Sequence, residues 1–250
     1  SQYVSAVLMA APLASGPVEI ALTGHDIGAR GYVDLTLAAM RAYGAKVEQE
    51  GAAEWKVEPG RYRATDFHVE PDASAATYLW AAEKLTGGAI DLGVPADAFT
   101  QPDAKAFEAM AAFPKMAHVI DGSQMQDAVP TLAVLAAYNE TPVRFTGIEN
   151  LRVKECDRIH ALWDGLNRIR HGLAEEEGDD LIVNGDPLLA GAHVDAKIDS
   201  YADHRIAMSF ALAGLKTGGI TILDPGCVAK TYPGYWDALA SLGVRLHMAP

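Results

Sequence analysis

The stretch that decides the fold is Asp203-His204-Arg205-Ile206-Ala207-Met208-Ser209-Phe210-Ala211-Leu212, in which a polar opening leads into an almost entirely apolar helix pattern. Three other stretches share this design: Ser1-Gln2 precedes YVSAVLMAAPLA, Asp72 precedes ASAATYLWAAEKL, and Asp127 precedes AVPTLAVLAAY. A helix that is apolar nearly all round has to be covered on every side. The four stretches therefore favour an α/β fold with helices in the interior and sheets outside. An ordinary α/β sandwich with buried helices remains the alternative.

Each apolar helix opens a repeated unit. A Gly or Pro follows it, and then a short alternating strand, expected at 18–22, 89–92, 143–146 and 220–223. Second helices are expected at 33–43, 103–112, 156–172 and 234–242, and further strands at 45–49, 118–120, 181–183 and 244–247. The chain thus reads as four copies of one α/β unit.

Composition narrows the class of protein. Half of the 250 residues are hydrophobic and 21% are charged, which is a globular composition for one large domain or two modest ones. The net charge of −13 argues against nucleic acid as a partner. No apolar stretch reaches the roughly 18–20 residues of a membrane span. The two cysteines lack a CxxC spacing, so we expect no disulfide framework and a cytoplasmic location.

Four cations stand beside acids or a histidine near expected helix ends: Lys154, Arg158, Arg205 and Lys230. The free N–H groups and partial positive charge of a buried helix N-terminus favour anions as well. In a chain this acidic, such local clusters of fixed cations predict a site for an anionic small molecule.

Lys154 and Arg158 are four residues apart, so on a helix they would share one face. The planar fork of Arg158 suits carboxylate or phosphate, and Glu155 beside it could shuttle a proton if burial sets its pKa. The alternative is a surface helix with intrahelical ion pairs.

Asp203 is placed to cap the helix that follows it, which puts Arg205 in the first turn, where the helix dipole disfavours a cation. Arg205 therefore needs an anionic partner, either a ligand or Asp203 or Asp199. Asp127 opens another apolar helix, and an Asp in that place is usually just an N-cap.

Several runs together resemble a known family. VKECDRI (153–159), DHRIAMSFAL (203–212) and VAKTYPGYW (228–236), in this order, are similar to motifs of the 5-enolpyruvylshikimate-3-phosphate synthases of the shikimate pathway. The runs SQYVSAVLMAAPLA (1–14), GYVDLTLAAMRAYG (31–44), DASAATYLWAA (72–82) and QDAVPTLAVLAA (126–137) resemble the same family. The resemblance covers essentially the whole chain, and three motifs in order are a specific signal.

The resemblance implies an inside-out α/β barrel built from ββαβ units, in two domains with the active site between them. Residues 1–69 would finish the first domain, and residues 70–250 would form most of the second. The chain has no initial methionine and begins directly in a helix pattern. We therefore expect a piece of a longer protein whose first two units are absent.

The resemblance also implies a reaction, the transfer of the enolpyruvyl group of phosphoenolpyruvate to the 5-hydroxyl of shikimate 3-phosphate. It implies no metal or other cofactor, and a monomer when complete. Contacts to shikimate 3-phosphate are implied for Ser1, Gln2, Tyr32, Asn150 and Lys154, with Gln2 also near phosphoenolpyruvate, and contacts to phosphoenolpyruvate are implied for Arg158, Arg205 and Lys230. Asp127 resembles the carboxylate that accepts the hydroxyl proton, Glu155 resembles the acid that protonates the methylene carbon, and Asp203 and His204 resemble supporting neighbours.

Some family features are missing from the sequence. Ala29 stands where a serine often contacts the substrate phosphate, a contact that Arg30 would have to replace, and Cys156 stands where the family usually has Ser or Thr. The family's N-terminal lysine, its GNAGT-type loop and one arginine have no counterpart. We therefore expect the isolated chain to have little or no activity.

Two other functions stay open at this point. The sister enzyme that moves the same group onto UDP-N-acetylglucosamine resembles the chain in fold but lacks the KE-x-DR and DHRIAM runs. A non-catalytic module of the same fold would be expected to lose charged site residues first, yet they are present here.

Overall fold

The computed structural model describes residues 2–23 and 28–248. The chain divides into two compact units, which are described separately. Unit 1 comprises Ser1–Pro71 and Asp97–Pro102, and unit 2 comprises Asp72–Ala96 and Asp103–Pro250. Among the described residues, no helix combines the length and the apolar character needed to cross a bilayer.

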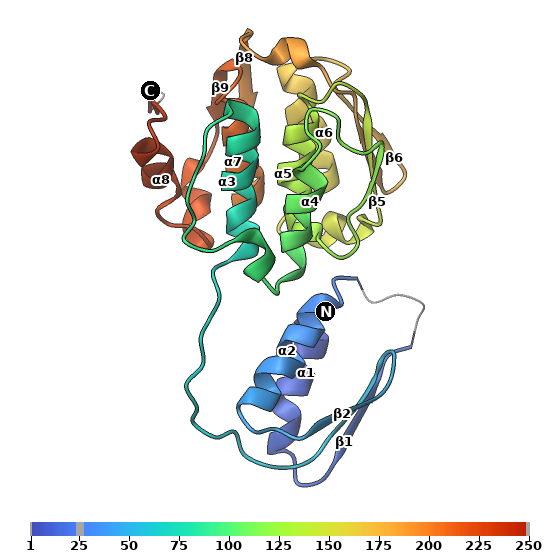
Figure 1. The fold of residues 1–250 in the computed structure, drawn as a ribbon. Helices are drawn as coiled ribbons and strands as arrows, with labels where there is room; N and C mark the ends of the chain where they lie inside the picture. Colours follow the sequence, from blue (N-terminus) through green and yellow to red (C-terminus); the bar gives the residue numbers. More distant parts are fainter. Residues whose placement is uncertain (1, 24–27, 249–250) are drawn as a thin grey trace. The chain divides into compact units, whose positions relative to one another are not determined.

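Unit 1 places two helices against a small antiparallel sheet (Figure 1). Its elements are α1 (Gln2–Ala10), η1 (Ala11–Leu13), β1 (Val18–Ala21), α2 (Gly31–Ala42), β2 (Val47–Gly51) and β3 (Glu54–Val57), with strand order β1-β3-β2. Leu8, Leu37 and Trp55 belong to the core that joins the helices to the sheet. In α1 only Leu8 is buried, so the prediction that this helix is covered on every side is wrong for the described structure.

Unit 2 is built around three helices, α3 (Ala73–Thr86), α5 (Val129–Ala136) and α7 (His204–Ala213), which pack against one another. Every residue of α5 is buried, and most of α3 and α7 is buried as well. Buried hydroxyls join the three helices, since Thr131 Oγ1 lies 3.2 Å from Thr77 Oγ1 and 3.4 Å from Ser209 Oγ. The prediction of interior apolar helices is confirmed for these three.

A four-stranded sheet and a two-stranded sheet accompany these helices (Figure 1). The first has the order β4-β5-β7-β6, from β4 (Val119–Asp121), β5 (Val143–Thr146), β7 (Asp180–Val183) and β6 (Ala174–Glu177); only the β4–β5 pair is parallel. The second pairs β8 (His193–Ile198) in parallel with β9 (Gly218–Ile222). The amphipathic helix α6 (Arg158–Ile169) packs against both sheets and against α5 and α7.

Short helical segments complete unit 2. They are η3 (Pro102–Lys105), α4 (Ala106–Met110), η4 (Gln126–Ala128), η5 (Glu149–Val153), η6 (Pro187–Leu189), η7 (Pro225–Lys230) and α8 (Tyr235–Ser241), and η2 (Ala96–Ala98) lies where the two units meet in the sequence.

Two predicted strands are wrong. Residues 89–92 form no strand; instead the Ile90 N–H donates to the side chain of Glu83 at 2.6 Å after Gly87 ends α3 in the left-handed region. Residues 244–247 form no strand either, because the Val244 N–H donates a hydrogen bond to the Leu239 carbonyl at the end of α8. The helix expected at 103–112 is split into η3 and α4. The structure adds β3, β6 and β8, whose charged residues obscure the strand pattern.

Candidate active site

Arg158 is the centre of a cluster of charged side chains in unit 2. It is the first residue of α6, and its side chain is only 1% exposed. Its Nε donates to Asp203 Oδ2 at 2.7 Å, its Nη1 to Asp127 Oδ1 at 2.8 Å, and its Nη2 to Glu155 Oε2 at 2.6 Å. Burial opposes the charge of this guanidinium, but Asp203 and Asp127 outweigh it and raise the pKa of Arg158. Three carboxylates therefore hold one buried cation.

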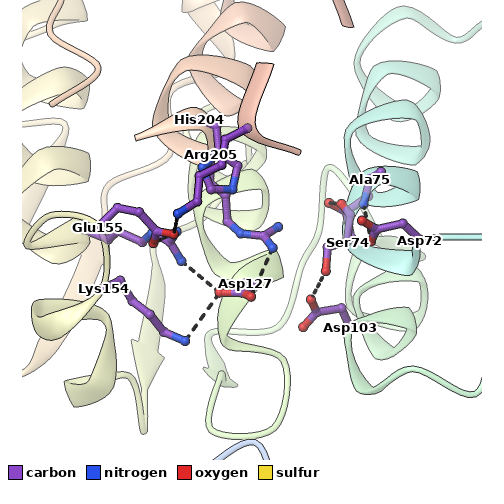
Figure 2. A network of polar contacts seen from close by, with 12 residues as sticks. Asp72, Ser74, Ala75, Asp103, Asp127, Lys154, Glu155, His204 and Arg205 are labelled. Carbon is purple, nitrogen blue, oxygen red and sulfur yellow. Dashed lines mark hydrogen bonds and ion pairs between the residues drawn. The ribbon is translucent and has the colours of Figure 1, made fainter. Parts of the chain in front are cut away.

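Asp127 pairs with three of the four predicted cations, Lys154, Arg158 and Arg205, and Figure 2 labels two of them, Lys154 and Arg205. Its Oδ2 lies 3.1 Å from Arg205 Nη2, and its Oδ1 lies 3.6 Å from Lys154 Nζ, on the same oxygen that Arg158 binds. Burial alone would raise the pKa of this carboxyl, but Arg205, Lys154 and Arg158 together lower it. Asp127 is thus ionised at neutral pH, which is the form that can accept a proton.

Glu155 joins the fourth cation to the cluster. Lys230, at the end of η7, donates to Glu155 Oε1, and Arg158 binds the other oxygen. Burial favours the neutral acid, but the hydrogen bond from Lys230 and the charge of Arg158 lower the pKa of Glu155 to about 2. As long as these cations are in place, Glu155 is a carboxylate, and it becomes an acid only when they are drawn away.

Asp203 is the one fully buried carboxylate among these acids, with an exposed fraction of 0%. It accepts a hydrogen bond from the Arg205 N–H at 2.8 Å, so the predicted N-cap of α7 is confirmed. The same side chain binds Arg158, a second role that the sequence did not reveal. The loop before it brings Tyr201 and Ala202 to φ values of 53° and 54°, which are unusual for residues other than Gly.

The expected helix face is wrong, and two alternatives that the sequence left open do not occur in the structure. Lys154 and Arg158 do not share a helix face, because Lys154 follows the last residue of η5 with a non-helical ψ of −147° and α6 begins only at Arg158. Arg205 pairs with Asp127 rather than with Asp203 or Asp199. Asp127 is no side-chain cap, because its carboxylate oxygens are turned to the cations.

The structure brings together six of the predicted site residues, all in unit 2: Asp127, Lys154, Glu155, Arg158, Arg205 and Lys230. Asn150 is half-buried in η5, the segment that leads to Lys154. Gln2 at the start of α1 and Tyr32 in the first turn of α2 belong to unit 1, and Ser1 lies outside the described residues.

Near Tyr32 lie Ala29, which departs from the family pattern, and Arg30, which would have to replace the lost serine contact. Ala29 has a φ of 52°, and the guanidinium of Arg30 donates to the Ala52 carbonyl.

The charges of the cluster nearly cancel. Four cations meet three carboxylates, Asp127, Glu155 and Asp203, which leaves one net positive charge in a chain whose own net charge is −13. Lys154, Arg205 and Lys230 are the partly exposed cations, and each holds a carboxylate that an incoming anion would replace. The arrangement can exchange an internal carboxylate for a phosphate or carboxylate of a ligand.

Comparison with known proteins identifies the family of the chain. The family model described as EPSP synthase (3-phosphoshikimate 1-carboxyvinyltransferase) matches residues 1–111 and 96–239. The chain belongs to the EPSP synthase family. A 3-phosphoshikimate 1-carboxyvinyltransferase of Pseudomonas syringae pv. syringae is 73% identical over 246 residues, and one of Rhizobium leguminosarum bv. trifolii is 72% identical over 244 residues. The matches cover 98% of this chain, but the chain spans only 59% of the length of the first relative and 58% of the second.

Solved structures show that this chain has the enolpyruvyl transferase fold, as predicted. An EPSP synthase from Acinetobacter baumannii matches with a TM-score of 0.73 at 25% identity, over 96% of this chain and 60% of that one. The enolpyruvyl transferase NikO from Streptomyces tendae matches with a TM-score of 0.71 at 18% identity, over 100% of this chain and 61% of that one, which speaks for the fold alone.

Proposed function

We propose that this chain forms the larger part of an enzyme that transfers the enolpyruvyl group of phosphoenolpyruvate to the 5-hydroxyl of shikimate 3-phosphate and releases phosphate. The observation that carries the proposal is the cluster in unit 2, where Lys154, Arg158, Arg205 and Lys230 surround Asp127 and Glu155. Both substrates carry a phosphate and a carboxylate, so their recognition requires several fixed cations.

The carboxylates have complementary roles in the proposed reaction. The oxygen of the 5-hydroxyl bonds to C2 of phosphoenolpyruvate while Asp127 takes the hydroxyl proton. At the same time Glu155 gives a proton to C3. The resulting tetrahedral intermediate then loses phosphate from C2 and a proton from C3, which restores the double bond. The ionised state of Asp127 supports its role as acceptor.

Glu155 needs its proton before it can act as an acid. With its pKa near 2, it is deprotonated while Lys230 and Arg158 hold it. In the proposed reaction the anionic groups of phosphoenolpyruvate draw Lys230 away and share the charge of Arg158, so the pKa of Glu155 rises and it takes up a proton. Substrate binding and proton donation are thereby coupled through Lys230.

The remaining residues and the domains complete the proposal. Arg158, Arg205 and Lys230 bind phosphoenolpyruvate, and Ser1, Gln2, Tyr32, Asn150 and Lys154 bind shikimate 3-phosphate. Residues 1–69 are the end of a first enolpyruvyl transferase domain, and residues 70–250 are most of a second. We further propose a cytoplasmic monomer that binds neither nucleic acid nor membrane. By itself the 250-residue chain has little or no activity, since part of the substrate site lies in the portion of the relatives that this chain does not span.

The test uses a joined protein, in which the portion of the Pseudomonas syringae relative that this chain does not cover is fused to the N-terminal side of residue 1. We expect phosphate release from phosphoenolpyruvate with shikimate 3-phosphate and none with UDP-N-acetylglucosamine. Turnover with the UDP-sugar instead would establish the sister activity. Tight binding of shikimate 3-phosphate without turnover would establish a non-catalytic module.

Variants of the joined protein then separate the roles. Glu155→Ala and Asp127→Ala should each lower kcat by roughly 10²–10⁴-fold, the usual range for a lost general acid or base. Unchanged turnover in Glu155→Ala would remove that residue from proton transfer.

A further inference from the structure

Arg152, in η5, binds three acids of unit 2 that lie outside the candidate active site. Its Nη1 donates to Asp157 Oδ2 at 2.9 Å, its Nε to Asp179 Oδ1 at 2.8 Å, and its Nη2 to Glu176 Oε2 at 3.1 Å. The same Nη2 donates to the Gly178 carbonyl at 2.5 Å. Asp157 is the N-cap of α6, and the other three acceptors belong to the β6–β7 hairpin, the two strands with the turn that joins them. Arg152 therefore ties η5 to a helix and to a sheet.

The ion pair between Arg152 and Asp157 closes the loop of chain that runs from one residue to the other. This closed loop carries Lys154 and Glu155, whose side chains bind residues of the candidate active site (Figure 2). Apolar packing does not hold the closed loop, because Val153 is 80% exposed and the side chains of Lys154 and Glu155 are 32% and 28% exposed. The positions of these two side chains therefore depend on how the ends of the loop are fixed.

The closure is a network rather than a single surface ion pair. Asp157 uses its Oδ2 for Arg152 and its Oδ1 for the His160 N–H, at 3.1 Å. Glu176 uses its Oε2 for Arg152, and its Oε1 lies 3.0 Å from His160 Nδ1. Both carboxylates are thus held at each oxygen, where η5, α6 and β6 meet. An exposed ion pair contributes little by itself, but charges bound in a network of good geometry hold a fixed arrangement.

Glu155 loses its own partners at the step in which it acts. Before substrate binds, Lys230 and Arg158 hold its two oxygens. In the proposed reaction phosphoenolpyruvate draws Lys230 away and shares Arg158, so these contacts no longer fix the carboxyl group. A general acid has to stay within reach of the atom that it protonates. The contacts of Arg152 with Asp157 and the hairpin involve neither cation, so substrate binding leaves the closure intact.

We propose that Arg152 and Asp157 are positioning residues, whose ion pair holds the closed loop so that Lys154 meets shikimate 3-phosphate and Glu155 meets phosphoenolpyruvate. This inference rests on the proposed function. Neither Arg152 nor Asp157 touches substrate in this scheme; both act through the loop that they close. The hairpin anchors the closed loop to the sheet.

The test compares Arg152→Gln and Asp157→Asn with the unmodified joined protein. Asp157→Asn removes the closing charge but keeps a side chain that can cap α6. We expect Arg152→Gln to lower kcat by roughly 10–100-fold, because a displacement of about 1 Å can cost a catalytic group that much. It should raise the KM for shikimate 3-phosphate, which Lys154 binds, by roughly three- to tenfold and change the KM for phosphoenolpyruvate by less than about twofold. Asp157→Asn should change the same constants in the same direction by smaller factors.

The matched control is Arg144→Gln. Arg144 lies in β5, its side chain is 33% exposed against 27% for Arg152, and it binds the same hairpin at Glu177 and Asp180. Its two ion pairs therefore anchor the hairpin without closing the loop. Arg144→Gln should lower Tm about as much as Arg152→Gln does and leave kcat and both KM values unchanged.

A second measurement does not depend on the reaction. In the 250-residue chain, Lys230 and Arg158 lower the pKa of Glu155 to about 2, so its carboxyl ¹³C titration reports whether it still lies against them. Opening the loop should move the midpoint upward in Arg152→Gln and in Asp157→Asn alike. A direct charge effect would instead move it upward in Arg152→Gln and downward in Asp157→Asn, because one variant loses a positive and the other a negative charge.

The outcomes separate the two proposals. An inactive unmodified joined protein would overturn the proposed function, and the titration would still test the closure. If both variants keep the kcat, the KM for shikimate 3-phosphate and the titration midpoint, the positioning role is wrong. Midpoints that move in opposite directions contradict it as well, as does an Arg144→Gln variant whose kinetic constants change as those of Arg152→Gln do. Should Arg152→Gln fail to fold, the kinetic constants and the midpoint of Asp157→Asn decide.

Discussion

Arg158 and Asp203 form an ion pair that is almost completely withdrawn from water, with 2.7 Å between Nε and Oδ2 and exposed fractions of 1% and 0%. The pair joins the first residue of α6 to the N-cap of α7, so one carboxylate fixes the start of two helices. Each of the other site cations has an exposed partner or is itself partly exposed. The rigid part of the site is therefore this pair, and the exchangeable part is built around it.

Removing Asp203 should be strongly destabilising. Asp203→Ala leaves a buried guanidinium with weaker compensation and also removes a helix cap, so we expect the free energy of unfolding to fall by about 3–5 kcal/mol. Urea unfolding followed by circular dichroism measures this. As the control, Asp157→Ala removes the cap of α6, which accepts from the His160 N–H, and should cost only about 1 kcal/mol. Equal losses in the two variants would contradict the special role of the buried pair.

Ala202 should be a site of stabilisation. Its φ of 54° lies in the left-handed region, where a residue with a Cβ costs roughly 1–2 kcal/mol. Gly removes that cost, and the greater conformational entropy that it gives the unfolded chain offsets only part of the gain. Ala202→Gly should therefore raise the free energy of unfolding by about 0.5–1 kcal/mol in urea titrations. Ala211→Gly, inside α7, is the matched control and should lower it by about 1 kcal/mol. Destabilisation by both substitutions would show that the loop is not strained.

Much of the site could be predicted from the sequence because its motifs are local. Asp203-His204-Arg205 shows a cap and a cation at the start of an apolar helix, and the structure places both there. The other cations also stand in short runs near expected helix ends, the family resemblance added their substrate roles, and six predicted residues meet in one cluster. By contrast, the partners of these cations are far apart in the sequence. The pairing of Arg205 with Asp127 spans two helices of unit 2, and no local pattern distinguishes Asp127 from Asp199 as the partner.

The wrong predictions of the fold have the same cause, because the partners of short segments are also far apart in the sequence. The interior helices α3, α5 and α7 are predicted from a nearly continuous apolar helix pattern, and their tertiary contacts agree with it. The segment at 89–92 has an apolar pattern too, but the structure gives its Ile90 N–H to the Glu83 side chain rather than to a strand. Strand β6, with the sequence AEEE, looks like a solvated turn, yet it pairs with β7. Whether a short segment finds a strand partner depends on the three-dimensional arrangement.

Gly165 of α6 lies close to the Phe210 ring of α7. A Cβ at this position would lie 2.4 Å from Cζ of the buried Phe210 ring, so Gly165→Ala should overpack the contact and lower the free energy of unfolding by about 1–3 kcal/mol. The control is Gly234→Ala, since a Cβ there meets nothing within 4 Å. Adding Phe210→Leu should recover part of the loss in a double-mutant cycle measured by urea unfolding. Additive effects would contradict a direct contact.

The ionisation of Glu155 should depend on Lys230. Burial favours the neutral acid, but Lys230 and Arg158 lower the pKa of Glu155 to about 2 from its ordinary value of 4.5. Because the folded-state pKa lies below the unfolded-state value, the stability that this carboxylate contributes is present above pH 4.5 and is lost as the pH falls toward 2. Lys230→Met removes the cation that donates to Glu155, so the carboxyl ¹³C resonance should titrate at a higher pH than in the unmodified chain. Lys115→Met, at an exposed pair with Glu140, should leave that titration where it is. An unchanged midpoint in Lys230→Met would show that Arg158 alone sets the charge of Glu155, and the proposed coupling between substrate binding and proton donation would then be lost.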